Sequence, residues 1–144
     1  MVFKVKKDSF FIFFLASAFL LVASVFLVPL FLDLERTILD TAVILTLLLV
    51  SAGFLLWCGL GVTYVMERDH LYLRGGPFRN RIPYEDITKV KKTSDIFTGY
   101  RLLSSRDGLE IFYKTASLGS VKISPADGER FKAELKKRCP GAAI

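Results

Sequence analysis

Two long apolar runs dominate the first half of the chain. Residues 9–32 and 41–66 contain no charged side chain, and a short charged segment at residues 33–40 separates them. A bilayer core about 30 Å thick requires roughly 20 helical residues, each rising about 1.5 Å. Because backbone groups in hydrocarbon must form hydrogen bonds within their own segment, both runs are predicted to be transmembrane helices.

A cleaved signal peptide is the alternative for the first run. A lysine-bearing start is followed by the triplet Ala16-Ser17-Ala18, which resembles a cleavage site. Strongly apolar sequence continues beyond this triplet, however, and a second apolar run follows it. The pattern therefore favours a helical hairpin with two spans.

The charges that flank the runs predict the orientation of this hairpin. Residues 1–8 carry three lysines and one aspartate, whereas the connector at residues 33–40 carries three carboxylates and one arginine. Most of the 20 lysines and arginines follow the second run. Under the positive-inside rule the chain is a multi-pass protein of the cell membrane, with residues 1–8 and 67–144 in the cytoplasm and the connector outside.

Small residues recur seven positions apart in both runs. The pairs are Ala16/Ser17 and Ala23/Ser24 in the first run, and Ser51/Ala52 and Cys58/Gly59 in the second. Since small residues allow helix backbones to approach closely, we expect these faces to pack against each other. A chance distribution of small residues is the alternative.

The rest of the chain consists of short runs typical of β-strands, followed by one helical segment. The predicted strands are residues 62–66, 70–74, 78–82, 87–92, 109–113 and 120–123. Residues 93–108, which are rich in small polar side chains, are predicted to form a loop. Residues 62–66 fit either the end of the second span or a first strand.

A strong helix start follows the last strand. In Ser124-Pro125-Ala126-Asp127, Ser124 is suited to cap the helix, Pro125 to occupy its first position and Asp127 to complete a capping box. Phe131 and Leu135 then form an apolar stripe. The pattern predicts an α+β domain at residues 67–144, in which a small curved antiparallel sheet is closed by a C-terminal helix.

Composition agrees with this division into two unlike parts. The chain has 144 residues, of which 52% are apolar, with a mean hydropathy of +0.43 and a formal net charge of +6. These values exclude a disordered chain and a disulfide-stapled mini-protein. The apolar content is an average over a lipid-facing hairpin and a small basic domain.

Residue types that usually carry catalysis are scarce. The chain has one histidine, His70, and two cysteines, Cys58 and Cys139, which together do not make a usual metal-ligand set. The Gly75-Gly76-Pro77 segment is typical of a turn, because no Lys-Ser or Lys-Thr pair opening a helix follows it. We therefore expect no enzymatic activity and no catalytic, cofactor-binding or metal-binding residue.

Six cations fall in neighbouring predicted strands close to the second span: Arg74, Arg79, Arg81, Lys89, Lys91 and Lys92. In one interpretation they contact anionic lipid headgroups or an acidic protein partner. Each cation near an anionic membrane surface contributes about 1 kcal/mol to binding. In the other they are an ordinary solvated face. Nucleic-acid binding is not expected without interleaved exposed aromatics or a recognition helix. The pattern does not indicate an oligomeric state.

Residues 72–87, which read Tyr-Leu-Arg-Gly-Gly-Pro-Phe-Arg-Asn-Arg-Ile-Pro-Tyr-Glu-Asp-Ile, resemble the signature of a bacterial PH-like family. This family is often labelled YyaB-like and is largely uncharacterised. The segments 6–8, 109–113 and 123–125 are similar to the family as well, so the resemblance covers nearly the whole chain. It implies two transmembrane helices and a PH-like domain of antiparallel strands with a C-terminal helix, and it implies no catalytic residue.

One segment departs from the family. Ser105-Arg106-Asp107-Gly108 stands where the family usually has Ser-x-Asp-Arg, so Gly108 replaces the arginine. We therefore do not assign to this chain any role that the arginine has in relatives, although Arg106 lies two positions before Gly108.

The function expected from these features is a membrane-anchored PH-like binding or adaptor module without enzymatic activity. Its partners would be the lipid bilayer and an anionic headgroup or a protein. The resemblance leaves a second function open, which is immunity against bacteriocins or antimicrobial peptides in envelope defence. Membrane proteins with this PH-like layout include bacteriocin immunity proteins.

Overall fold

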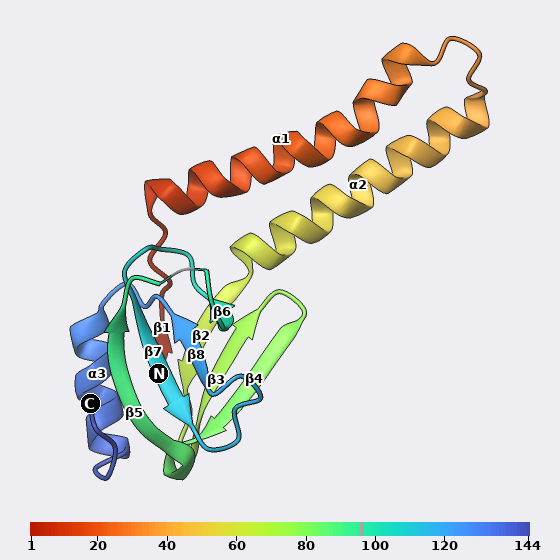
Figure 1. The fold of residues 1–144 in the computed structure, drawn as a ribbon. Coiled ribbons are helices and arrows are strands. Elements are labelled where there is room, and N and C mark those ends of the chain that lie inside the picture. The colour runs from red at the N-terminus through yellow and green to blue at the C-terminus, as the bar shows by residue number, and fades with distance from the viewer. Residues whose placement is uncertain (96) are drawn as a thin grey trace.

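A computed structural model describes residues 1–95 and 97–144. It consists of a long helical hairpin and a β-domain in which two four-stranded sheets pack together, with a helix along one side (Figure 1). The two long apolar helices, the antiparallel sheets and the C-terminal helix confirm the predicted fold class.

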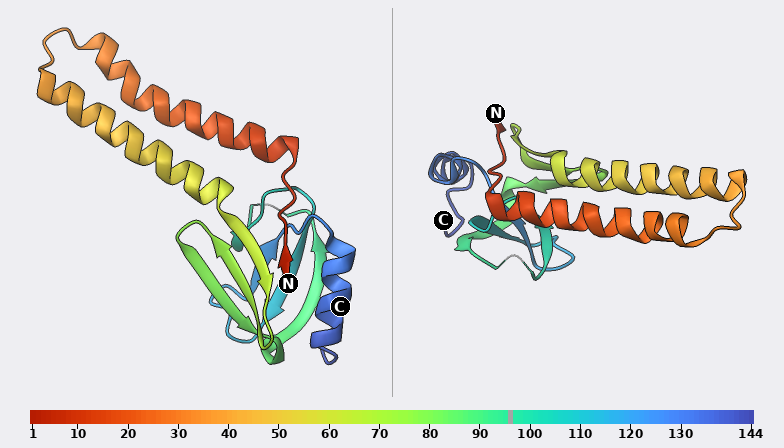
Figure 2. Two further views of the ribbon diagram at one scale, coloured as in Figure 1. Left: turned by 180° about the vertical axis from the view of Figure 1, so that it is seen from behind. Right: turned by 90° about the horizontal axis from the view of Figure 1, so that it is seen from above.

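The hairpin consists of α1 (Ser9–Leu32) and α2 (Ile38–Leu60), which run side by side away from the domain (Figure 2). Both helices are long and apolar enough to cross a membrane, and the most apolar window of each contains no buried residue. These properties suggest that the hairpin anchors the protein in a membrane. At Gly59 the helices are in close contact, since a Cβ at this position would lie 2.9 Å from Leu15 Cδ1.

The second helix differs from the predicted range 41–66 at both ends. It begins at Ile38 because Thr37 and Asp40 form a capping box, in which Thr37 Oγ1 accepts from the Asp40 backbone N–H and the Asp40 carboxylate accepts from that of Thr37. It ends at Leu60, and the β-branched run after it forms β2 (Val62–Met66) by pairing with a neighbouring strand.

The first sheet has the strand order β1-β2-β3-β4 and is antiparallel throughout. Its other strands are β1 (Val2–Phe3), β3 (His70–Gly75) and β4 (Phe78–Pro83). A 3-10 turn, η1 (Tyr84–Asp86), leads to the second sheet.

The second sheet has the order β5-β7-β8-β6, and β6 runs parallel to β8. Its strands are β5 (Ile87–Thr93), β6 (Tyr100–Leu102), β7 (Gly108–Tyr113) and β8 (Ser120–Ile123). The structure confirms all six predicted strands. It adds β1 and β6, so the prediction that residues 93–108 form only a loop was wrong; Ile96 in that range lies outside the described residues.

The C-terminal helix α3 (Gly128–Arg138) begins later than predicted. Asp127 caps it by accepting a hydrogen bond of 3.0 Å from the Arg130 N–H. Ser124 is instead fully buried, where its hydroxyl accepts from the Ser104 N–H and its own N–H donates to the Tyr64 hydroxyl. The prediction that Ser124 caps the helix was wrong because these core groups use the serine.

The core lies between the two sheets and α3. Tyr64, Leu73, Ile111 and Phe131 are fully buried there, and each such side chain contributes on the order of 2 kcal/mol to folding. The Tyr64 hydroxyl also donates to the Leu102 carbonyl, which joins the first sheet to β6.

Residues 1–8 are part of the domain. Phe3 packs edge-on against Phe131 of α3, with ring centroids 5.0 Å apart, and the N-terminus lies beside this helix (Figure 2). The Lys6 N–H donates to the Ser124 carbonyl at 2.8 Å, and the Ala126 N–H donates to the Lys4 carbonyl at 2.8 Å. Both ends of the hairpin therefore start from one folded domain. Residues 1–8 and 62–144 consequently lie at the same end of the hairpin.

Candidate functional site

Three of the six predicted cations gather on the outer surface of the first sheet. Arg74 on β3 lies directly opposite Arg79 on β4, and Arg81 lies opposite Tyr72, with its guanidinium 5.8 Å from the ring centroid. Strand alternation explains this placement, because Leu71 and Leu73 on β3 point into the core. Arg74, Arg79 and Arg81 are called the arginine face below.

The turn beside the arginine face packs on the end of α2. The Gly76 N–H donates to the Gly61 carbonyl at 3.3 Å, and a Cβ at position 76 would lie only 2.9 Å from Cys58 Cα. Gly76 also has a φ of +59°, which favours glycine. Because Arg74 and Arg79 lie one pair from this turn and the hairpin leans over β3 and β4 (Figure 1), the arginine face lies near the domain end of the hairpin.

The arginine face forms no ion pair among the described residues, although Asp69 and Glu85 line one surface pocket together with Arg81. Among residues 1–95 and 97–144, no carboxylate lies within ion-pairing distance of Arg74, Arg79 or Arg81. Like charges directly opposite each other on neighbouring strands destabilise a sheet. An external anion bound at this pair would therefore reduce the repulsion between Arg74 and Arg79.

The three predicted lysines lie elsewhere, on β5 of the second sheet. Lys92 forms an ion pair of 2.7 Å with Glu129 of α3, Lys91 lies opposite Glu110, and Lys89 lies opposite Phe112. Hydrogen bonding and the attraction of Glu129 raise the pKa of Lys92, and the bond to Lys92 lowers the pKa of Glu129. Since β5 is not paired with β4, the structure divides the six cations into the arginine face and a lysine strand, Lys89, Lys91 and Lys92.

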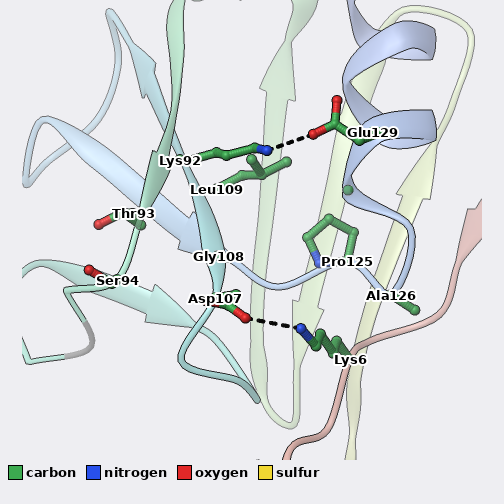
Figure 3. Close-up of a pocket in the computed structure, with 11 residues that line it drawn as sticks. Lys6, Lys92, Thr93, Ser94, Asp107, Gly108, Leu109, Pro125, Ala126 and Glu129 are labelled. Atoms are coloured by element: carbon green, nitrogen blue, oxygen red, sulfur yellow. Dashed lines mark hydrogen bonds and ion pairs between the residues drawn. The ribbon is translucent and has the colours of Figure 1, made fainter.

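A charged pocket of about 500 Å³ adjoins the lysine strand (Figure 3). Two ion pairs cross its mouth, Lys92–Glu129 and Lys6–Asp107, the latter at 3.1 Å. Each cation of the pocket is thus matched by a carboxylate from another element. The pocket has no surplus charge with which to attract an ion, in contrast to the arginine face.

A third cluster joins α1 to the domain at Asp8. The Asp8 carboxylate accepts hydrogen bonds from the N–H groups of Phe11 and Arg106, at 2.8 Å and 2.7 Å, and from the Ser105 hydroxyl at 3.1 Å. Burial by itself would raise the pKa of Asp8, but the hydrogen bonds from Arg106 and Phe11 outweigh it and keep the pKa low. Asp8 therefore caps α1 and fastens it to the loop before β7.

Gly108, the departure from the family, lies at the start of β7 in close contact with its neighbours. A Cβ at this position would lie 2.7 Å from the Ile123 carbonyl oxygen and 2.6 Å from Leu103 Cδ2, so a larger side chain in this chain would require both neighbours to shift. Arg106 stacks on Phe10 of α1, with its guanidinium 4.0 Å from the ring centroid.

Sequence reasoning did not identify the Asp8 cluster. The position of Asp8 directly before an apolar run is a helix-capping signal that could have indicated its role towards α1. Its bonds to residues 105 and 106 span about a hundred positions and leave no local signal.

The one histidine and the two cysteines are the residues considered for chemistry. His70 lies 3.9 Å from a Glu67 carboxylate oxygen, and Cys58 and Cys139 are free thiols. Burial raises the pKa of the Cys139 thiol. Within the part of the chain that the structure describes, no group of three potential metal ligands is assembled.

The model of the bacterial PH domain family matches residues 62–139, the region from β2 to the end of α3. The uncharacterized protein YyaB of Bacillus subtilis (strain 168) is 33% identical over 96 residues, which cover 67% of this chain. The match spans 65% of that relative's own length. No solved structure matches the chain significantly. The family match agrees with the resemblance expected from residues 72–87, and the chain belongs to the bacterial PH domain family.

Proposed function

We propose that this protein is a membrane-anchored binding module without enzymatic activity, whose arginine face binds anionic headgroups of the adjoining leaflet. The observation that carries the proposal is the Arg74–Arg79 pair, two cations in direct opposition without a counter-charge in the described chain, next to the turn that packs on α2. Anionic phosphates beside the hairpin would supply the missing charge.

The proposed orientation places the domain in the cytoplasm. The excess of lysines and arginines in the domain and the carboxylates of the outer connector support this side. The leaflet that faces the domain would then be the negatively charged one.

The bonds between domain and hairpin support the proposal energetically. Residues 1–8 and β2 fix the domain to both helices. Because the domain is already held in place, binding of the arginine face to headgroups costs less conformational entropy than it would for a domain on a flexible tether. Each cation at such a surface contributes on the order of 1 kcal/mol.

The test is lipid selectivity of the full chain, because a fragment starting at residue 67 would lack β1 and β2 of the first sheet. Spin-labelled phosphatidylglycerol and phosphatidylcholine report selectivity in vesicles that contain the protein. For Arg74→Gln with Arg79→Gln we expect selectivity for phosphatidylglycerol to fall by about tenfold or more, from roughly 1 kcal/mol per cation.

Lys89→Gln with Lys91→Gln is the matched control, because it removes the same charge from the lysine strand. It should leave selectivity almost unchanged. Equal loss in both double variants, or no loss in either, would contradict headgroup binding by the arginine face, and a protein-binding role would then be the remaining function for this surface.

A further inference from the structure

A second feature at the membrane end of the domain is a cavity of about 430 Å³ between the start of α1 and the segment around β6. Its lining consists of Phe10, Phe11, Phe14, Phe97, Arg101, Leu103 and Ser105. This volume lies within the range of about 300–1,000 Å³ that is usual for small-molecule sites. The cavity lies on the Asp8 side of the junction and is separate from the arginine face.

The wall of the cavity combines apolar surface of the hairpin and of the domain. Phe14 of α1 and Phe97 of the domain are 59% and 73% exposed. Lipid beside the hairpin would cover Phe14, but Phe97 belongs to the segment between β5 and β6, outside the helices. An apolar occupant that continues from the bilayer into the cavity would cover both rings.

The wall at Phe97 is held in place by a buried lysine. Lys122 of β8 has a side chain that is 4% exposed, and its Nζ donates to Asp95 Oδ2 at 2.9 Å and to Thr98 Oγ1 at 3.0 Å. The Thr98 hydroxyl also donates to the Asp95 carboxylate. Bonds from Thr98 and Lys122 lower the pKa of Asp95, so the Asp95 carboxylate stays ionised and accepts both bonds at neutral pH.

Positive charge meets the apolar wall where α1 leaves the domain. Arg101 of β6 lines the cavity, and the guanidinium of Arg106 lies over the Phe10 ring in the first turn of α1. The nearby carboxylate of Asp8 accepts three bonds from Phe11, Arg106 and Ser105. Cations next to aromatic rings at the domain end of α1 are complementary to a molecule with a phosphate and a fatty chain.

We propose that this cavity binds one anionic glycerophospholipid of the adjoining leaflet, with its phosphate at Arg101 and Arg106 and one acyl chain against Phe11, Phe14 and Phe97. A soluble anion would make no use of the phenylalanine wall, and an apolar ligand would make no use of the arginines. The inference rests on the membrane anchoring of the proposed function but not on headgroup binding by the arginine face.

The experiment is native mass spectrometry of the full chain in detergent, titrated with phosphatidylglycerol or phosphatidylcholine. We expect one phosphatidylglycerol to be retained per chain and phosphatidylcholine to be retained several-fold less. Phe97→Ser and Arg101→Gln should each reduce retention of phosphatidylglycerol at least fivefold. Thermal unfolding of each variant shows whether the fold is kept.

The matched controls are Phe78→Ser, which removes another exposed phenylalanine, and Lys89→Gln on the lysine strand. Both should retain the single lipid as the unaltered chain does. Absence of a retained lipid, equal retention of both lipids, or full retention by a folded Phe97→Ser variant would overturn the proposal. Loss in the two cavity variants with unchanged vesicle selectivity would separate this site from the arginine face.

Discussion

The arginine face and the lysine strand carry the same number of cations, yet their surroundings differ. Lys92 has Glu129 at 2.7 Å, and Lys91 faces Glu110 across the sheet, whereas Arg74 faces Arg79. The lysine strand lies beside α3, and the arginine face lies beside the turn that packs on α2. Charge alone therefore does not define a binding surface. A cation is available to an external anion when the strand register places no carboxylate opposite it, and it can reach the membrane only when it lies near the hairpin.

The largest expected effect comes from the turn that holds the arginine face against α2. Gly76→Ala places a Cβ 2.9 Å from Cys58 Cα at a positive φ, so we expect a loss of about 3 kcal/mol in the free energy of unfolding, of which the left-handed backbone accounts for about 1–2. Thermal or denaturant unfolding in micelles measures it.

Gly119→Ala is the control for backbone strain alone, because Gly119 has a φ of +81° and open space around its Cα. It should cost only about 1 kcal/mol. Equal losses at the two positions would show that contact between the turn and α2 contributes nothing.

A smaller effect with opposite signs should appear when one charge on each surface is reversed. Arg79→Glu places a carboxylate opposite Arg74, so it should stabilise the domain by about 0.5 kcal/mol while lipid selectivity falls. Lys91→Glu places a carboxylate opposite Glu110 and should destabilise the domain by a similar amount, about 0.5 kcal/mol, without changing selectivity.

Unfolding curves and spin-label selectivity, measured on the same samples, check both variants. If Arg79→Glu lowered stability, Arg74 would not be an unpaired cation in need of a counter-charge, and the comparison between the two surfaces would fail.

The local pattern of apolar and charged residues was sufficient to predict much of the fold. Charge-free runs predicted the helical hairpin, and alternation predicted strands such as His70–Gly75. Strands of two or three residues, Val2–Phe3 and Tyr100–Leu102, were missed because only their pairing with Tyr64 or Val121, far away in sequence, defines them.

The candidate sites depend even more on distant contacts. Alternation indicates which side chains share a face of one strand, but it does not indicate that β4 and β5 belong to different sheets. It therefore could not separate Arg81 from Lys89. The cavity between Phe14 and Phe97 arises where residues more than eighty positions apart meet, and no spacing rule contains it.

The smallest expected effect concerns pH and affects only the lysine strand. The pKa of Glu129 is lower in the folded chain than its ordinary value of 4.5, first through its bond to Lys92. A depressed pKa contributes stability that is present above the unfolded value and is lost as pH falls through the folded one. Stability contributed by Glu129 should therefore be present at pH 7 and be lost as the pH falls below its ordinary pKa of 4.5.

Unfolding of the unaltered chain and of Glu129→Gln, compared from pH 7 to pH 3, measures this contribution as the difference between the two curves. The difference should shrink towards acid pH. Because no carboxylate of the described chain pairs with the arginine face, and lipid phosphates stay ionised, selectivity at the arginine face should not follow the titration of Glu129. A parallel loss of selectivity would mean that the two surfaces are coupled through the sheets and act as one site.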